Sequence, residues 1–345
     1  MEIIIGLLII AIGAFCQSSC YVPINKIKEW SWESYWIVQG VFAWLLLPLL
    51  GALLAVPEGH CLCELFTSSN TFNVFMTILF GVLLGVGGLT FGLSMRYLGV
   101  ALGQSIALGT CAGLGTIMGP VLLNIFFPEI NALDKLTFAV ITGVVVTLLG
   151  IAVIGVAGSM KAASLSEEEK KAAVKDFNFP KGLTIALLAG FMSGCFNVGL
   201  EFGKDINFGD LTQDMYKTLP ATFLVTFGGF VTNAIYCFFQ DSKNKTWSDY
   251  GKGRVWANNA IFCALAGALW YSQFFGLSIG KGFLQGSETL TTLAFCILMA
   301  LNVVFSNVWG IILKEWKGCS KKTIAVLLVG IVILIISSFL PELLK

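Results

Sequence analysis

The sequence predicts an all-α membrane protein in which ten transmembrane helices form a 5+5 inverted repeat. The prediction rests on composition, on the length of the uncharged stretches, and on a similarity between the two halves of the chain. Of the 345 residues, 57% are hydrophobic and only 12% are charged, against about 25% charged residues in an ordinary soluble domain. Mean hydropathy is +0.85. So few charged side chains cannot cover a water-soluble protein of this length, and the composition therefore indicates the membrane class.

Ten stretches contain no Asp, Glu, Lys or Arg, and each is long enough to cross a bilayer, which takes about 20 apolar residues in a helix. They are residues 3–22, 34–56, 72–94, 97–125, 136–160, 182–200, 218–239, 255–280, 289–313 and 323–340. Strands of a membrane β-barrel would be about 10 residues long with alternating polarity. That pattern is not present, so helices are expected.

The longest polar stretch, 159–181, divides the chain into a first five-helix repeat, 1–158, and a second, 182–345. Within it, SLSEEEKKA (164–172) predicts a capped surface helix. The sequence GLLIIAIGAF of the first half aligns with GLTIALLAGF of the second, and FGLS ends both the third and the eighth span. Because five is an odd number, the second half must enter the membrane from the opposite side, as in the inverted repeats of secondary transporters.

Lysine and arginine placement predicts the orientation. Of the 21 basic residues, 16 follow the first, third, fifth, seventh or ninth span. The five on the opposite side are Lys135, Lys204, Lys217, Lys281 and Lys345. The side richer in basic residues is expected in the cytoplasm, so both termini are expected in the periplasm.

Several functions are excluded or disfavoured by what the sequence lacks. A net charge of +1 gives no basic surface for a nucleic acid. No P-loop, H-E-x-x-H or G-x-S-x-G motif is present, so neither an enzyme nor a bound cofactor is expected. The segment HCLCE (60–64) contains the single histidine but lacks the paired spacing of a zinc site. An ordinary loop without metal is expected there.

Polar groups inside the spans are the candidates for binding a solute. Amides offer both donors and an acceptor to sugar hydroxyls, and aromatic rings can cover the apolar face of a sugar. The substrate-binding candidates are Gln17, Gln104, Asn197, Trp270, Tyr271 and Gln273. Further amides in the spans are Gln39, Asn233, Asn302 and Asn307. The alternative interpretation is that the aromatic residues belong to the interfacial belt or core and that the amides join helices through hydrogen bonds.

Proton coupling would require a carboxylate, because no histidine lies within a span. Glu33, Glu201 and Glu288 each border an apolar stretch. Glu33 would begin the second helix, and Glu201 would share a helix face with Asn197 at the i, i+4 spacing. The alternative is a capping or snorkelling role at the edge of the membrane.

Four motifs, taken in order, resemble the L-rhamnose–proton symporter family over nearly the whole chain, with the ten spans in the same places. The motifs are Y21-V-P23 with K26-x-K28-x-W30-S-W32-E33, then M95-R96-Y97-L98-G99, W270-Y271-x-Q273-F274-F275 and L313-K314-E315-W316. The resemblance implies the drug/metabolite transporter superfamily. It further implies alternating-access uptake of a 6-deoxyhexose, in the first place L-rhamnose, with a proton across a bacterial inner membrane.

Glu33 ranks above Glu201 as the proton-coupling candidate because it lies inside a matching motif. We expect Glu29, Glu33 and Trp36 to share one helix face. We also expect Trp32 and Arg96 to form an inner gate with Glu33.

A sodium-coupled or uniport carrier of another small polar solute is the alternative within the same class. A membrane-embedded transferase and a structural or signalling bundle are alternatives from other classes. The sequence does not predict an oligomeric state.

Overall fold

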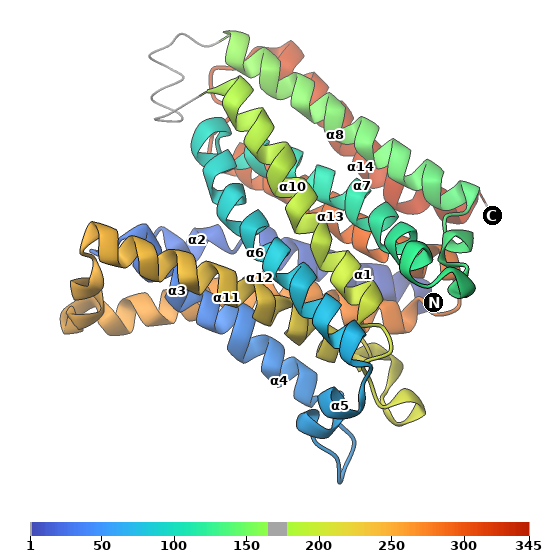
Figure 1. Cartoon of the computed structure of the whole chain (residues 1–345). Coiled ribbons are helices and arrows are strands. Elements are labelled where there is room, and N and C mark those ends of the chain that lie inside the picture. The colour runs from blue at the N-terminus through green and yellow to red at the C-terminus, as the bar shows by residue number, and fades with distance from the viewer. Residues whose placement is uncertain (1, 165–177, 345) are drawn as a thin grey trace. The chain divides into compact units, whose positions relative to one another are not determined.

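The computed structural model describes residues 2–164 and 178–344, and every regular element in these ranges is a helix (Figure 1). The α-helices are α1 (Glu2–Ser18), α2 (Tyr21–Ile24), α3 (Trp32–Gly40), α4 (Leu47–Leu53), α5 (Leu62–Ser68), α6 (Thr71–Leu98), α7 (Val100–Phe126), α8 (Phe138–Ser164), α10 (Phe179–Phe202), α11 (Leu219–Asn244), α12 (Gly253–Phe283), α13 (Glu288–Ile312) and α14 (Lys321–Leu343). Shorter helical segments are η1 (Val41–Leu46), η2 (Pro128–Ile130), η3 (Ala132–Lys135), η4 (Gly209–Leu211), η5 (Asp214–Tyr216) and η6 (Trp247–Gly251). Ten helical segments of the described chain are long and apolar enough to cross a membrane, which confirms the ten predicted spans.

The chain forms two compact units, each assembled from two separate stretches. Unit 1 comprises Met1–Val86 and Gly199–Phe283, and unit 2 comprises Gly87–Val198 and Leu284–Lys345. The units therefore draw helices from both predicted repeats, because packing joins helices that are distant in sequence. The division into repeats 1–158 and 182–345 stays a prediction. Most of the predicted surface helix at 164–172 lies outside the described residues.

In unit 1, α1 packs along α12, and α11 packs against α3 and α4. Glycines let α1 and α12 approach backbone to backbone. A Cβ atom on Gly13 would lie 2.9 Å from the carbonyl oxygen of Ser272, and one on Gly276 would lie 3.1 Å from that of Ile9. Such close approach through small residues is how helices associate where lipid removes the hydrophobic driving force.

In unit 2, α8 packs against α14 and α7 packs against α13; Figure 1 shows α8 and α14 running side by side. Gly99, the last residue of the M-R-Y-L-G motif, is required by the backbone conformation at its position. It is the one residue between α6 and α7, and its φ of +83° is a conformation that side chains with a Cβ rarely adopt. A glycine is therefore needed for the chain to reverse within a single residue.

The second span is an α-helix interrupted by the π-helical turn η1. Pro48 follows this turn, lacks a backbone N–H, and would clash with the carbonyl four residues earlier in a regular helix. The helix widens instead, and the N–H of Leu47 bonds to the carbonyl of Phe42, five residues back. The widened turn lays the ring of Trp44 against Gly40, where a Cβ would lie 2.8 Å from the ring. π-Helical turns occur frequently at functional sites.

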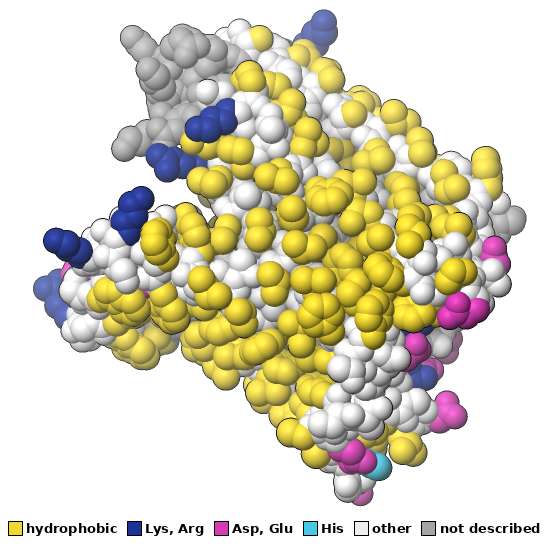
Figure 2. All heavy atoms as spheres, in the orientation of Figure 1, with side chains coloured by type: hydrophobic (Ala, Val, Ile, Leu, Met, Phe, Trp, Pro, Cys, Tyr) yellow, Lys and Arg dark blue, Asp and Glu magenta, His cyan; other side chains and the backbone are white. Residues whose placement is uncertain are grey.

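Exposed apolar side chains line the outer faces of the spans. On α1 they recur at helical spacing, and the most exposed are Ile4, Leu8, Ile12 and Phe15. Figure 2 shows hydrophobic side chains along the sides of the helices and charged side chains gathered at helix ends. A water-soluble protein rarely exposes apolar patches of this extent. The molecule is a multi-pass membrane protein.

Replacing Gly81 by alanine should destabilise the protein, because a Cβ there would lie 2.2 Å from the carbonyl oxygen of Val225 in α11. Forcing a methyl group into a packed interface costs about 1–3 kcal/mol. The matched control is Gly92→Ala in the same helix, where a Cβ meets nothing within 4 Å. The control should leave stability unchanged or raise it by up to about 1 kcal/mol. Thermal unfolding of both variants in detergent measures the difference, and equal melting temperatures would refute this account of the α6–α11 contact.

Candidate functional site

Glu33 lies in the first turn of α3 and is buried. The prediction that it begins the second span is confirmed. Its Oε1 accepts hydrogen bonds from Asn244 Nδ2 at 2.8 Å and from Thr246 Oγ1 at 3.0 Å. The start of a helix also favours a negative charge. The segment after α11 therefore closes over the N-terminus of α3 and supplies donors to this carboxylate.

Glu29 does not share the face of Glu33 and Trp36, so that part of the prediction is wrong. Glu29 has a φ of +59° and precedes the helix, which begins at Trp32. Its backbone carbonyl accepts a hydrogen bond from Lys252 Nζ at 2.6 Å. The helical periodicity that linked the three residues is broken by the left-handed turn.

Asp241 is a buried carboxyl that lies beyond the predicted apolar stretch 218–239, because α11 continues to Asn244. Lys245 then adopts a left-handed φ of 60°, and the N–H groups of Lys245 and Thr246 both bond to the backbone carbonyl of Asp241. This turn brings Thr246 Oγ1 within 2.8 Å of Asp241 Oδ1. Tyr250 donates its hydroxyl to Asp241 Oδ2 at 2.9 Å. The sequence feature that could have identified Asp241 is its position as the first acidic residue after an apolar span.

Asp249 is the third buried carboxyl of this junction. Its Oδ2 accepts hydrogen bonds from the backbone N–H and the hydroxyl of Ser31, both at 2.7 Å, and from Ser34 Oγ at 3.0 Å. Lys252 Nζ lies 2.6 Å from Oδ1. These contacts tie η6 to the residues that begin α3. We call the assembly of Ser31–Ser34, Asp241, Thr246 and Asp249 the α3–α11 junction.

Asp249 is held ionised by its partners. Burial raises the pKa of its carboxyl, but the hydrogen bonds from Lys252, Ser31 and Ser34 outweigh burial and lower the pKa to about 2. The pKa of the neighbouring Tyr250 is raised, first by burial and then by its hydrogen bond to Asp241. Tyr250 therefore stays a hydrogen-bond donor throughout the physiological range.

Five aromatic rings form a continuous row through unit 1. Trp32 stacks on Trp36 with centroids 5.1 Å apart, and Trp36 meets Trp44 edge to face at 5.6 Å. The row continues from Trp44 to Trp270 at 5.9 Å and from Trp270 to Phe274 at 5.0 Å. It links the gate candidate Trp32 to the substrate-binding candidate Trp270. Contacts of this geometry contribute about 0.5–1.5 kcal/mol each beyond buried area.

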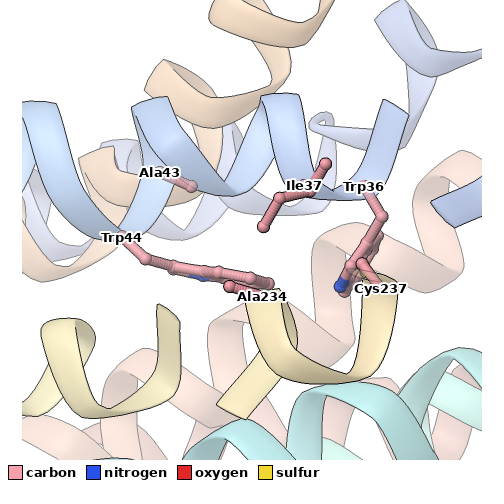
Figure 3. Close-up of a cluster of buried hydrophobic side chains, with 6 residues drawn as sticks. All are labelled: Trp36, Ile37, Ala43, Trp44, Ala234 and Cys237. Carbon is pink, nitrogen blue, oxygen red and sulfur yellow. The ribbon is translucent and has the colours of Figure 1, made fainter. Parts of the chain in front are cut away.

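The middle of this row packs on α11. Figure 3 shows Trp36 and Trp44 projecting from the second span toward Ala234 and Cys237 of α11. Trp36 Nε1 donates to Asn233 Oδ1 at 2.9 Å, so Asn233 satisfies the buried indole N–H. Asn233 acts here as an interhelical hydrogen-bond partner, as the alternative interpretation of the amides proposed.

Four buried polar atoms in unit 1 have no hydrogen-bond partner among the described residues. They are the hydroxyl of Tyr271, Oε1 of Gln39, Nε1 of Trp30 and Oδ1 of Asn73. The Tyr271 hydroxyl lies against Gly51, where a Cβ would be 2.0 Å away. Gln273 instead donates its Nε2 to the backbone carbonyl of Trp270 at 3.1 Å, and Gln17 is buried in α1. An unsatisfied buried polar atom costs about 1–3 kcal/mol, which a bound water or ligand would offset.

The amides of unit 2 mostly bridge helices. Gln104 accepts a hydrogen bond from Ser306, and Asn307 Nδ2 donates to Ser105 Oγ at 2.8 Å, so α7 and α13 are joined twice. Asn197 Nδ2 donates to the carbonyl of Gly115 at 2.9 Å. The Oδ1 atoms of Asn197 and Asn307 remain without a partner within the described part of the chain.

The remaining candidates are divided between the two units. Glu201 is half-buried near the end of α10 and belongs to unit 1, like Glu33. Arg96 lies in the last turn of α6 and belongs to unit 2. A pairing of Glu33 with Arg96 stays a prediction.

The segment around His60 is not the simple loop expected, because Leu62–Ser68 form helix α5. Cys61 caps this helix, its sulfur accepting the N–H of Glu64 at 3.3 Å, while His60 Nδ1 lies 3.1 Å from Glu64 Oε2. Over residues 2–164 and 178–344, no group of three or more His, Cys, Asp or Glu side chains has the arrangement of a metal site.

Replacing Asp249 by asparagine should lower stability at neutral pH by about 2 kcal/mol, the free energy that corresponds to lowering a carboxyl pKa from 3.8 to about 2. Because the pKa is lower in the folded state, this stabilisation is present above about pH 4 and is lost as the pH falls toward 2. The difference between wild type and Asp249→Asn should therefore shrink in acid. Denaturation of both proteins over this range measures it, with the exposed Asp210→Asn as control. A difference independent of pH would contradict the assignment.

Comparison with known proteins identifies the family. The family model described as L-rhamnose-proton symport protein (RhaT) matches residues 1–343. Proteins named L-rhamnose-proton symporter from Yersinia pestis (strain Pestoides F) and Yersinia pseudotuberculosis serotype O:1b (strain IP 31758) are each 30% identical to this chain over 344 residues, covering 97% of it and 96% of each relative. The chain therefore belongs to the L-rhamnose-proton symport protein family.

Proposed function

We propose that this protein is a secondary active transporter that takes up L-rhamnose, or a closely related 6-deoxyhexose, together with a proton by alternating access. The observation that carries the proposal is the match of the family model to residues 1–343, together with relatives of nearly equal length that are named for this activity. The ten spans and the absence of enzyme motifs from the sequence agree with a carrier.

The chemistry of the buried polar groups supports a neutral, hydroxyl-rich substrate. Within each unit, buried groups without a partner among the described residues have the chemistry to pair with sugar hydroxyls: Gln39 and Tyr271 in unit 1, and Asn197 and Asn307 in unit 2. The row of aromatic rings includes Trp270, whose indole ring is suited to the apolar face of a deoxysugar. We propose Trp270 and Tyr271 as the first contacts, with Gln17, Gln104, Asn197 and Gln273 as further substrate-binding candidates.

The hydrogen bonds of Glu33 favour coupling to a proton over coupling to a sodium ion. Its Oε1 is occupied by two hydrogen-bond donors, Asn244 and Thr246, whereas a bound cation requires converging acceptor oxygens. We propose that Glu33 belongs to the coupling site, that Glu201 is the second candidate, and that Trp32 and Arg96 contribute to the gate. Sodium coupling and uniport remain the alternatives that the transport assay separates.

We propose a bacterial inner-membrane location, as for a carrier related to proteins from Yersinia, and the placement of basic residues supports both termini in the periplasm. Helix pairing supports a 5+5 repeat of the drug/metabolite transporter type. The second span packs on the seventh, the fourth on the ninth and the fifth on the tenth, so three pairs of equal rank meet, whereas the first span packs on the eighth. A pseudo-two-fold axis relating the two repeats would produce this pattern.

The direct test is transport by the purified protein in sodium-free proteoliposomes. An inward proton gradient should drive accumulation of L-rhamnose, and addition of L-rhamnose without a gradient should raise the external pH as protons enter with the sugar. A panel of deoxyhexoses and hexoses ranks the substrates. Accumulation that requires sodium, or equilibration without accumulation, would favour the sodium-coupled or uniport alternative.

Replacing Glu33 by glutamine should abolish proton-driven accumulation while sparing counterflow exchange, because exchange needs sugar binding and movement but no net proton transfer. Uptake with and without a proton gradient measures both. Glu58→Gln removes an exposed carboxylate and serves as the control. Full accumulation by Glu33→Gln would remove Glu33 from the coupling site.

Replacing Tyr271 by phenylalanine should raise the KM for sugar about tenfold, since one hydrogen bond to a ligand is worth about 1 kcal/mol or slightly more. Counterflow kinetics measure the KM, and Tyr236→Phe on α11 removes the hydroxyl of a more exposed tyrosine as control. If the Tyr271 hydroxyl binds no sugar, the variant should keep the wild-type KM and gain stability, because a buried unsatisfied group has been removed.

A further inference from the structure

Within the α3–α11 junction, Asp241 and Glu33 approach the same hydroxyl group. Thr246 Oγ1 lies 2.8 Å from Asp241 Oδ1 and 3.0 Å from Glu33 Oε1. A threonine hydroxyl carries a single hydrogen, so it can donate fully to one of these two carboxyl oxygens. The other contact is a hydrogen bond only if that carboxyl supplies the hydrogen itself. The shared hydroxyl therefore favours one proton on this pair of acids.

Cationic side chains do not pair with these two acids in the part of the chain that the structure describes. Among the described residues, neither Asp241 nor Glu33 lies within ion-pair distance of a lysine, arginine or histidine. The nearby Lys252 is engaged by Asp249 and by the backbone carbonyl of Glu29. A buried carboxylate without a cation or enough donors is strongly unfavourable, and such a group takes up a proton instead.

The surroundings decide which acid holds the proton. Asp241 is fully buried and lies in the last turn of α11, where the partial negative charge of the helix end disfavours a carboxylate. Glu33 lies in the first turn of α3, where the helix end favours one, and it also receives the amide of Asn244. A proton on Asp241 Oδ1 gives one consistent chain in which Asp241 donates to Thr246 and Thr246 donates to Glu33.

The other groups facing Asp241 fit this arrangement. Tyr250 donates to Asp241 Oδ2, the oxygen left without the proton. Cys237 lies one turn earlier on α11 and is buried beside Trp36. Asp249 and Lys252 form their own ion pair and are joined to Asp241 only through the long contact, 3.5 Å, of Ser34 Oγ.

Resting on the proposed function, we propose that Asp241 carries the proton that is coupled to sugar uptake and that the Thr246 hydroxyl connects it to Glu33. Asp241 releases the proton when the α3–α11 junction opens, because water can then reach the carboxylate and stabilise its charge. The protonated acid keeps the junction closed, because all its hydrogen bonds are then made. Deprotonation would place two negative charges on one hydroxyl and favour separation of α3 from the segment after α11.

The test uses the full-length protein in proteoliposomes, beginning with the wild type. Sugar-induced proton uptake by the wild type tests the proposed function alone. In Asp241→Asn, the amide Nδ2 can donate to Thr246 as the protonated acid does, so the variant should fold and exchange sugar within about twofold of wild type. Proton-driven accumulation should fall at least about tenfold, and exchange should lose its pH dependence.

The matched control is Asp210→Asn, which removes an exposed carboxyl in unit 1 and should transport as wild type. If the wild type and Asp241→Asn both take up protons with sugar, the assignment of Asp241 is overturned while the proposed function stands. If the wild type itself moves sugar without protons, the proposed function fails first.

A second pair of variants keeps the proposal testable should Asp241→Asn not fold. Thr246→Val removes the shared hydroxyl at nearly constant shape, and Thr246→Ser retains it. The valine variant should lose accumulation while counterflow persists, and the serine variant should restore accumulation. Wild-type accumulation by Thr246→Val would overturn the role of the hydroxyl link.

Discussion

A carboxyl group that leaves water must find donors, find a cation, or hold a proton, and this constraint organises the junction between α3 and the segment after α11. Glu33, Asp241 and Asp249 are all buried there, yet within residues 2–164 and 178–344 a single lysine, Lys252, pairs with any of them. The donors come from helix ends and short turns: the N-terminus of α3, the left-handed turn at Lys245, and η6. The junction is therefore built almost entirely from backbone turns that aim hydroxyl and amide groups at carboxyl oxygens.

The three acids have different environments and therefore different roles. Asp249 receives a lysine, a backbone N–H and two hydroxyl groups, so it stays ionised and acts as a structural clamp. Asp241 receives a tyrosine hydroxyl and shares one threonine, with a helix C-terminus behind it. Acids whose surroundings differ in this way are the usual basis of proton chemistry in proteins. A symporter requires such a group, because protonation must be linked to the closing or opening of a contact.

Much of the fold could be predicted from the sequence, because a bilayer imposes about 20 apolar residues on each spanning helix and charge counts then mark the helix ends. The position of Glu33 followed in the same way. Asp241 was missed because counting uncharged residues ends a span at the first charge, whereas the helix continues for another turn. Glu29 was misplaced because its left-handed backbone conformation has no signal in helical periodicity.

The assembly of helices into two units and the partners of each amide were beyond sequence reasoning. Gln104 bridges two helices through Ser306, whereas the Oδ1 atom of Asn197 has no partner among the described residues. This difference depends on helix rotation and on glycine contacts between segments far apart in the chain. Periodicity describes one helix at a time and contains no such information. The widened turn before Pro48, which positions Trp44, is likewise a tertiary outcome of a local steric conflict.

Infrared spectroscopy of the protein in lipid measures the central claim most directly, because a protonated carboxyl has a carbonyl stretch distinct from that of a carboxylate. At neutral pH the wild type should show this band, and Asp241→Asn should lack it. A wild-type spectrum in which every buried carboxyl is ionised at neutral pH would contradict the account.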